Sequence, residues 1–207
     1  MPGEKEFFVT IDSACGPEEF REKNSRFISF VFPVTSAEEA DGVVSRLRKE
    51  YRDANHVCFA FRLGNEKGEE AYFRFSDDGE PGSTAGFPIY NEIKSKDYLN
   101  VLVAVVRYFG GIKLGTGGLV RAYAAGARKV LDISSAVTVY IKKEVALNFP
   151  YDLTGEIMQV VQRFSLDILH REYRANGVAL KLAVPVAQMA NVAKAVTDMS
   201  GGKISIE

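Results

Sequence analysis

The fold depends most on the stretch Val101-Leu-Val-Ala-Val-Val106 and on the residues that follow it, Arg107-Tyr-Phe-Gly-Gly-Ile-Lys-Leu-Gly-Thr-Gly-Gly118. An apolar run without alternation is typical of a strand that is covered on both faces of its sheet. We therefore expect a central strand over residues 100–109 and a glycine-rich loop over residues 110–118. Apolar residues at helical spacing then predict a helix from about Gly118 to Ile133.

The sequence before this stretch predicts further elements of the same domain. Arg26–Val34 is apolar and aromatic, which favours a strand. Ser36 and Glu39 have the spacing of a capping box, which predicts a helix through about Tyr51. The other expected elements are a hairpin of two strands (His56–Leu63 and Ala71–Phe75), a loop (Ser76–Ser83) and a helix (Thr84 to about Lys94).

The end of the chain predicts a second, smaller domain. Small, turn-prone residues at Ser134–Thr138 indicate a boundary, so we expect domains over residues 1–136 and 137–207. The dipeptide Asn176-Gly177 is typical of a tight hairpin turn. The expected order is strand (Val139–Phe149), helix (Tyr151–Phe164), strand (Leu166–Tyr173), strand (Val178–Val184), helix (Ala187–Met199) and strand (Lys203–Ile206). This βαββαβ order is the ferredoxin-like arrangement, and the whole chain is predicted to be an α+β protein.

Composition excludes several classes of protein. The chain has 207 residues and a net charge of −1, so it is not a globally basic nucleic-acid binder. Its two cysteines are too few for a disulfide scaffold and fit a reducing cytosol. The longest apolar run is far too short to cross a bilayer, and the first residues do not resemble a signal peptide. We expect a soluble, cytoplasmic protein that does not bind membranes.

A concentrated basic zone surrounds the glycine-rich loop. Between Tyr98 and Leu131 there are five basic residues and no acidic one, so this stretch carries +5 and the rest of the chain −6. A helix N-terminus offers unpaired N–H groups and a partial positive charge, and glycines let a ligand approach the backbone closely. The predicted anion-binding or RNA-binding residues are Arg107, Gly110, Gly111, Lys113, Gly115, Gly117, Gly118, Arg121, Tyr123 and Arg128.

Other interpretations of this zone remain open. The helix shows Arg121 and Arg128 on the stripe opposite its apolar face, where they can simply be solvated. Tyr123 can stack on a base, although its place on the apolar face favours core packing. The loop lacks the Gly-Lys-Ser/Thr ending of a P-loop, and Val120 stands where a dinucleotide fingerprint needs glycine.

An acidic loop is the second candidate feature. Asp77, Asp78 and Glu80 place three carboxylates within four residues, which can hold Mg²⁺ or orient a cationic side chain. An acidic surface turn explains the same residues, because Asp forms local hydrogen bonds in turns. The acidic and basic loops can also pair with each other, which would make both mainly structural.

A third candidate is the pair His56 and Cys58. Two residues apart on a strand, they face the same side, as metal ligands or a nucleophile and its base would. A half-buried strand with a small apolar cysteine is the simpler interpretation. We expect no metal site and no cofactor.

Three motifs resemble one protein family. Arg107-Tyr-Phe-Gly-Gly-Ile-Lys-Leu-Gly-Thr-Gly-Gly-Leu-Val-Arg-Ala-Tyr123 resembles the signature of the IMPACT family in its bacterial, YigZ-type form. Ser76-Asp-Asp-Gly-Glu-Pro81 with Thr84-Ala-Gly86 resembles its second motif, and Asp53-Ala-Asn-His-Val-Cys-Phe-Ala-Phe-Arg62 its third. The sequence departs from the second motif at Gly82-Ser83, where the family has the order Ser-Gly.

The resemblance carries expectations for fold and function. It implies an N-terminal domain like ribosomal protein S5 domain 2 and a C-terminal domain like domain V of elongation factor G. Eukaryotic members, which share only the N-terminal part, are translation regulators that compete for a co-activator of the starvation-responsive kinase that phosphorylates an initiation factor. The bacterial-type members have no settled biochemical activity.

Three functions follow as hypotheses. The first is a non-enzymatic, translation-associated protein that binds RNA or the ribosome through the basic loop and helix. The second is an enzyme that acts on a phosphorylated small molecule or nucleotide, with Lys113 and Arg121 on the phosphate. The third is a regulator whose basic zone binds an acidic protein partner.

Overall fold

Strand β6 (Val101–Tyr108) is the middle strand of a five-stranded antiparallel sheet with the order β2-β3-β6-β4-β5. The computed structural model describes residues 5–206 and divides them into two units. The N-terminal unit contains this sheet and spans residues 7–139, and the C-terminal unit spans residues 140–206 together with Lys5 and Glu6. The other four strands of the sheet are β2 (Cys15–Glu22), β3 (Ser25–Pro33), β4 (His56–Gly64) and β5 (Glu70–Ser76).

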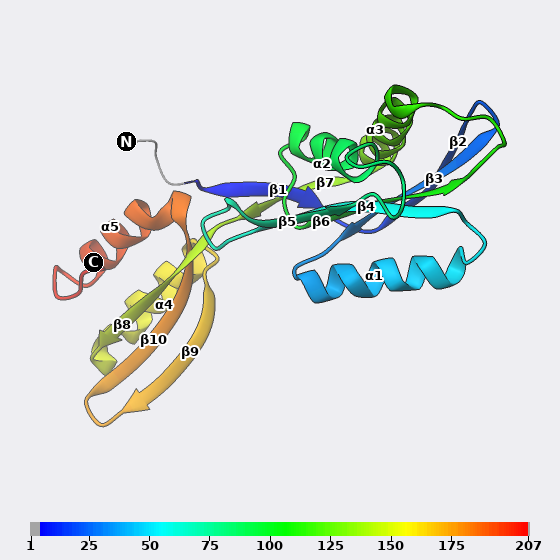
Figure 1. Cartoon of the computed structure of the whole chain (residues 1–207). Helices are drawn as coiled ribbons and strands as arrows, with labels where there is room; N and C mark the ends of the chain where they lie inside the picture. Colours follow the sequence, from blue (N-terminus) through cyan, green and yellow to red (C-terminus); the bar gives the residue numbers. More distant parts are fainter. Residues whose placement is uncertain (1–4, 207) are drawn as a thin grey trace. The chain divides into compact units, whose positions relative to one another are not determined.

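Helices cover both faces of this sheet, as the apolar run of β6 predicts (Figure 1). Helix α1 (Ala37–Glu50) lies on one face, where Leu102, Ala104 and Val106 are buried. Helices α2 (Gly86–Ser95) and α3 (Thr116–Ile133) lie on the other, where the core contains Val101, Val103 and Val105. The Ser36 hydroxyl caps α1 by accepting a hydrogen bond from the Glu39 N–H at 3.2 Å.

Three strands were not expected from the sequence. Strand β2 forms one edge of the sheet, and β1 (Phe7–Ile11) pairs with β7 (Ala136–Tyr140) in a separate two-stranded sheet. The expected domain boundary after residue 136 therefore falls inside β7. Strand β2 is mostly exposed and carries mostly polar residues, so it lacks the apolar alternation that reveals a strand in a sequence.

The C-terminal unit has the order βαββα. Its antiparallel sheet has the order β8-β10-β9, and one face packs against two helices around an apolar core. The elements are β8 (Lys142–Phe149), a short 3₁₀ turn (Tyr151–Leu153), α4 (Thr154–Arg163), β9 (Asp167–Arg174), β10 (Gly177–Pro185), a second 3₁₀ turn (Val186–Gln188) and α5 (Met189–Met199).

The predicted last strand over Lys203–Ile206 is wrong. Residues 203–206 form no strand, although Ile204 is buried in the apolar core of this unit. Gly201 and Gly202 turn the chain with positive φ, and the Ile204 N–H donates to the Ser200 hydroxyl rather than to a neighbouring strand. Among residues 5–206, no helix is long and apolar enough to cross a membrane.

Candidate functional site

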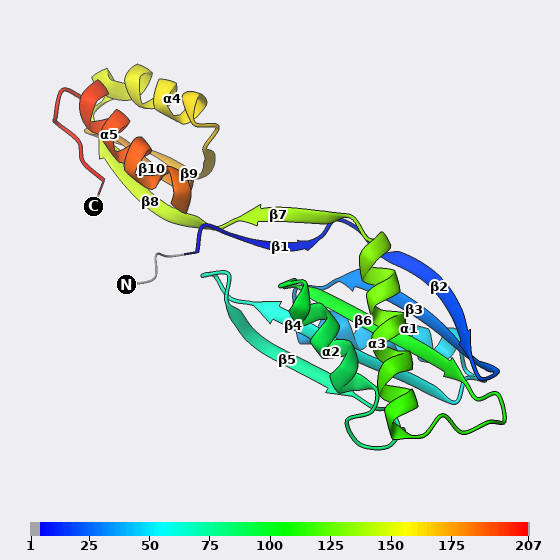
Figure 2. The same cartoon turned by 90° about the horizontal axis from the view of Figure 1, so that it is seen from above.

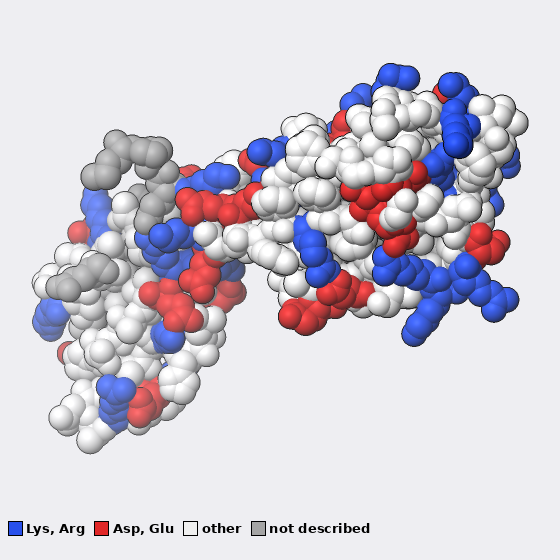
Figure 3. All heavy atoms as spheres, viewed as in Figure 1, with Lys and Arg blue, Asp and Glu red and all other residues white. Residues whose placement is uncertain are grey.

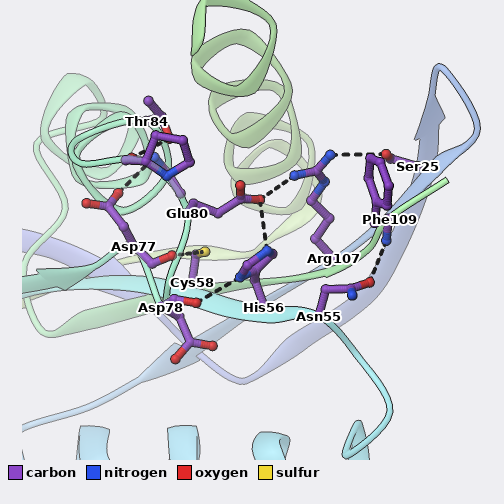
Figure 4. A network of polar contacts seen from close by, with 12 residues as sticks. Ser25, Asn55, His56, Cys58, Asp77, Asp78, Glu80, Thr84, Arg107 and Phe109 are labelled. Atoms are coloured by element: carbon purple, nitrogen blue, oxygen red, sulfur yellow. Dashed lines mark hydrogen bonds and ion pairs between the residues drawn. The ribbon is translucent and has the colours of Figure 1, made fainter. Parts of the chain in front are cut away.

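The acidic loop and the basic stretch meet in a buried ion pair. The Arg107 guanidinium donates to Glu80 Oε1 at 2.5 Å, with 6% and 4% of the two side chains exposed (Figure 4). The Tyr123 hydroxyl donates to the same carboxylate oxygen at 2.7 Å. A second donor of the guanidinium reaches the Ser25 hydroxyl at 3.2 Å. The possibility of internal pairing is therefore confirmed for Glu80 and Arg107.

Strand order explains how residues so far apart in the sequence meet. Strands β4 and β6 are neighbours, and their register places His56 opposite Arg107. The acidic loop follows β5, on the far side of β4, and folds back over this end of the sheet. As a result the His56 Nε2 atom lies 3.8 Å from Glu80 Oε1, and its Nδ1 atom lies 2.8 Å from the Asp78 carbonyl oxygen.

Asp77 caps helix α2. Its Oδ1 atom accepts hydrogen bonds from the N–H groups of Ala85 at 2.9 Å and Gly86 at 2.8 Å, and its Oδ2 atom accepts one from Ser83 at 2.8 Å. The N-cap residue of α2 is Ala85, which has no side chain to do this, and the first turn has no acidic residue. The carboxylate therefore satisfies amides that the helix leaves unpaired.

Asp78 is also held by groups of the protein. The Val57 N–H donates to its Oδ2 atom and Arg48 to its Oδ1 atom, each at 2.6 Å. All three carboxylates of the acidic loop thus have protein donors. Within residues 5–206, no group of three or more His, Cys, Asp or Glu side chains is placed to hold a metal ion.

Cys58 and His56 face the same side of β4 but do not form a nucleophile–base pair. The Cys58 thiol is fully buried and donates to the Asp77 carbonyl oxygen at 3.0 Å. Burial raises the pKa of Cys58 above its ordinary value, so the thiol stays protonated and unreactive at neutral pH. Burial likewise raises the pKa of Tyr123. This side chain lies in the core rather than at the surface, so a nucleotide base cannot stack on its ring.

The glycines of the loop after β6 serve different purposes. A Cβ atom at Gly110 would lie 2.1 Å from the backbone of Asn24, so this glycine allows the loop to pack against the turn between β2 and β3. Figures 1 and 2 show the two segments side by side. Gly111 and Gly115 have positive φ, and a Cβ atom at either would meet nothing within 4 Å. The second half of the loop is therefore open to solvent.

The N-terminus of α3 carries the exposed cations. Its N-cap is Gly115, no side chain caps it, and its first turn has no acidic residue. Lys113 and Arg121 are both exposed, and among residues 5–206 neither forms a salt bridge. We call these two residues and the amides of residues 116–118 the α3 basic site.

A cleft of about 230 Å³ adjoins this site. Its apolar wall comes from β2 and α3, and its polar rim includes Arg121 and Lys23. Figure 3 shows lysine and arginine side chains grouped over the end of the N-terminal unit where the β2–β3 hairpin lies. The lining residues are Phe20, Glu22, Lys23, Leu114, Gly118, Arg121, Ala122 and Ala125.

Other predicted cations already have partners. Arg128 pairs with Glu92 at 2.7 Å, and Lys129 lies 4.0 Å from Glu18. Arg107 is buried, so it can support the loop but cannot reach a ligand at the surface, contrary to the position expected for it. Lys23 was missed because it precedes the glycine-rich loop by about 90 residues and nothing in the sequence joins the two.

Comparison with known proteins shows which family this chain belongs to. Residues 23–131, which contain the ion-pair network and the α3 basic site, match the family model described as the Impact N-terminal domain. The chain belongs to the IMPACT family. Residues 147–203 of this IMPACT family member match a second model, described as a domain of unknown function.

Relatives match both parts of the chain. An IMPACT family member of Haemophilus influenzae is 30% identical over 98% of this chain and 96% of its own length. The IMPACT family member YigZ of Escherichia coli is 33% identical over 89% of each chain. A crystal structure described as a hypothetical protein aligns with a TM-score of 0.72 and 30% identity, covering 98% of this chain and 97% of that one. These matches extend over both parts of this chain.

Proposed function

We propose that this IMPACT family member is a non-enzymatic, translation-associated regulatory protein of the cytoplasm that binds RNA or the ribosome through the α3 basic site. One observation carries the proposal: Lys113 and Arg121 are exposed at the N-terminal end of α3 and form no salt bridge among the described residues. This helix has no acidic residue in its first turn and no side-chain cap. Cations at this end of a helix cost a few tenths of a kcal/mol, and a bound anion offsets that cost.

The rest of the zone supports a phosphate ligand rather than a structural role. Arg107, Arg128 and Lys129 all have acidic partners, whereas Lys113 and Arg121 have none in the part of the chain that the structure describes. The open space at Gly111 and Gly115 allows a large anion to approach the amides at the start of α3. A role in translation is the one that the family resemblance implies for eukaryotic members.

The alternative, an enzyme acting on a phosphorylated small molecule or nucleotide, has less support. Such an enzyme would need a free carboxylate to bind Mg²⁺ or to accept a proton. Asp77, Asp78 and Glu80 are each bound by protein donors, and Cys58 is a buried thiol. A thermal-shift screen of nucleotides with and without Mg²⁺ tests this alternative, for which stabilisation that depends on Mg²⁺ is the expected sign.

Salt dependence of RNA affinity tests the main proposal. We expect the double variant Lys113→Gln/Arg121→Gln to bind ribosomal RNA more weakly and to lower the slope of log K against log salt by roughly 0.7 to 0.9 for each lost phosphate contact. The variant Arg128→Gln/Lys129→Gln also removes two positive charges, but from residues of α3 that have acidic partners, and its slope should stay close to that of the wild type. Equal slopes for wild type and both variants would exclude RNA contact through this site.

A regulator that binds an acidic protein would use the same cations. Nuclease treatment separates the two partners: we expect binding of the purified protein to ribosomal particles to be lost when the exposed RNA is digested. Binding to a single protein that survives digestion, and that Lys113→Gln/Arg121→Gln abolishes, would replace the RNA proposal with the protein-partner one.

A further inference from the structure

The two edges of the five-stranded sheet are built differently. Edge strand β2 contains Pro17 and the charged residues Glu18, Glu19, Arg21 and Glu22, and its pairing with β3 is irregular between Cys15 and Glu18. Proline, charge and irregular pairing are the features by which proteins keep an edge strand from pairing with another chain. This edge is therefore protected.

Edge strand β5 lacks this protection. Its sequence, Glu70-Ala-Tyr-Phe-Arg-Phe-Ser76, has no proline, and Tyr72–Ser76 pairs with β4 in regular register. Figure 2 shows β5 at the outer edge of the sheet. Within the N-terminal unit, nothing pairs with its outer backbone groups among the described residues. An edge of this kind is a template for strand addition.

Large aromatic side chains surround this edge on both faces. Tyr72, Phe73 and Phe87 are 47%, 43% and 42% exposed. The rings of Phe73 and Phe87 lie on the α2 face, with centroids 4.7 Å and 6.2 Å from the Tyr90 ring. The Tyr72 ring lies on the α1 face, 5.8 Å from Phe61. Large aromatic side chains that are exposed next to one another are typical of interaction sites.

The sequence of β5 fits a second copy of itself. If two β5 strands pair antiparallel with Phe73 on the two-fold axis, Phe73 lies opposite Phe73, and Tyr72 of each copy lies opposite Arg74 of the other. Opposed residues share a face of the sheet. Arg74 already lies over the rings of Phe59 and Phe61, with centroid distances of 5.7 Å and 5.1 Å, so its guanidinium suits an aromatic neighbour.

The charges on β5 do not oppose pairing with a second copy. Arg74 is the one charged residue among Ala71–Ser76, and in this register it lies opposite a tyrosine rather than a second arginine. No like charges are therefore opposed across the pair. We propose that two copies of this chain associate through antiparallel pairing of their β5 strands about Phe73, which joins the two five-stranded sheets into one continuous sheet.

Solution mass tests this dimer directly. We expect light scattering on the full chain to show a mass that rises from monomer to dimer with concentration, and Phe73→Glu to keep the protein monomeric at every concentration. Tyr173→Glu, which changes an exposed aromatic residue of β9 in the C-terminal unit, should dimerise like the wild type. A wild-type chain that stays monomeric, or a dimer that persists in Phe73→Glu, would overturn the proposal.

Cross-linking checks the register without introducing a charge at the edge. Directly opposed residues have Cα atoms about 4.5 to 5.5 Å apart, within the reach of a disulfide. In a Cys15→Ser background, we expect Phe73→Cys to give a covalent dimer on mild oxidation and Tyr173→Cys to give none. A Phe73→Cys protein that folds but fails to cross-link, or one that cross-links no better than Tyr173→Cys, would refute pairing about Phe73.

Discussion

Glu80 holds the buried network together because it compensates a guanidinium that water cannot reach. Its carboxylate accepts hydrogen bonds from Arg107 and Tyr123, and His56 lies within 4 Å. Taking a charge out of water costs several kcal/mol unless a partner and hydrogen bonds replace the solvent. The acidic loop is thereby tied to β6 and α3, the two elements that flank the glycine-rich loop.

Removing this charge should destabilise the protein strongly. We expect Glu80→Gln to lower the free energy of unfolding by about 3 kcal/mol or more, because the Arg107 charge remains buried without a counterion. Urea unfolding monitored by circular dichroism measures the change. Asp132→Asn, which breaks the exposed pair with Lys96, should cost less than about 1 kcal/mol. Similar losses for the two variants would show that the Glu80–Arg107 pair is not a stabilising contact.

The buried hydroxyl and thiol should make stability fall at alkaline pH. Burial raises the pKa of Cys58 from its ordinary value of 9.0 and that of Tyr123 from 10.0, so the folded state keeps protons that the unfolded state releases. Their contribution to stability is full below pH 9 and declines as the pH rises, by about 1.4 kcal/mol per pH unit for each group at most.

Tyr123→Phe isolates one of these contributions. We expect the free energy of unfolding of this variant to decline less steeply between pH 9 and pH 11 than that of the wild type. Tyr173→Phe, which changes an exposed tyrosine of the C-terminal unit, should leave the wild-type slope unchanged. If Tyr123→Phe and the wild type lose stability in parallel over this range, the Tyr123 hydroxyl is not protected from ionisation in the folded state.

At the scale of residues, the contact between Glu80 and Arg107 could not be derived from the sequence. The sequence identifies both residues as special but leaves open whether their loops bind ligands separately or pair with each other. Their contact requires the strand order β6-β4-β5, which no local pattern reveals. Asp77 is similar: it caps a helix that begins nine residues later, beyond the spacing of a local capping box.

At the scale of elements, the glycine-rich loop divides into a packed half and an open half. The packed half contacts the two-residue turn of Lys23 and Asn24, whose positive φ angles are typical of a tight hairpin. The open half leads to the N-terminus of α3. The two halves should therefore respond differently to the same substitution.

Alanine at Gly110 and at Gly117 tests this division. Gly110→Ala places a Cβ atom against the backbone of Asn24, and we expect it to destabilise the protein by about 1 to 3 kcal/mol. Gly117→Ala adds a Cβ atom in the first turn of a helix, where its nearest neighbour is the end of the flexible Arg121 side chain at 3.7 Å. We expect this variant to be neutral or stabilising by up to about 1 kcal/mol. Thermal unfolding compares the two, and equal losses would mean that the whole loop is packed.

Elements with strong local signals are predictable from the sequence, and those that depend on neighbours are not. The capped helix α1, the hairpin of β4 and β5 and the central strand β6 follow from spacing and apolarity. Strand β2 forms because β3 offers it a partner, despite its charged residues. Residues 203–206 look like a strand, but the Ser200 hydroxyl satisfies the Ile204 amide instead.

At the scale of the whole molecule, a nearly neutral chain keeps a local positive charge. The net charge is −1, yet the stretch from Tyr98 to Leu131 carries +5, of which Lys113 and Arg121 lack acidic partners in the described part of the chain. Such a site binds polyanions weakly at high salt and more tightly at low salt. That dependence distinguishes it from an apolar docking surface such as the β5 edge.

Co-sedimentation with ribosomes at low and high salt tests the proposed function most directly. We expect the wild type and Arg128→Gln/Lys129→Gln to sediment with ribosomes at low salt and to be released at high salt, and Lys113→Gln/Arg121→Gln to stay in the supernatant at both. If Lys113→Gln/Arg121→Gln sediments as well as the wild type, or if the folded wild type never sediments with ribosomes, the α3 basic site does not bind the ribosome.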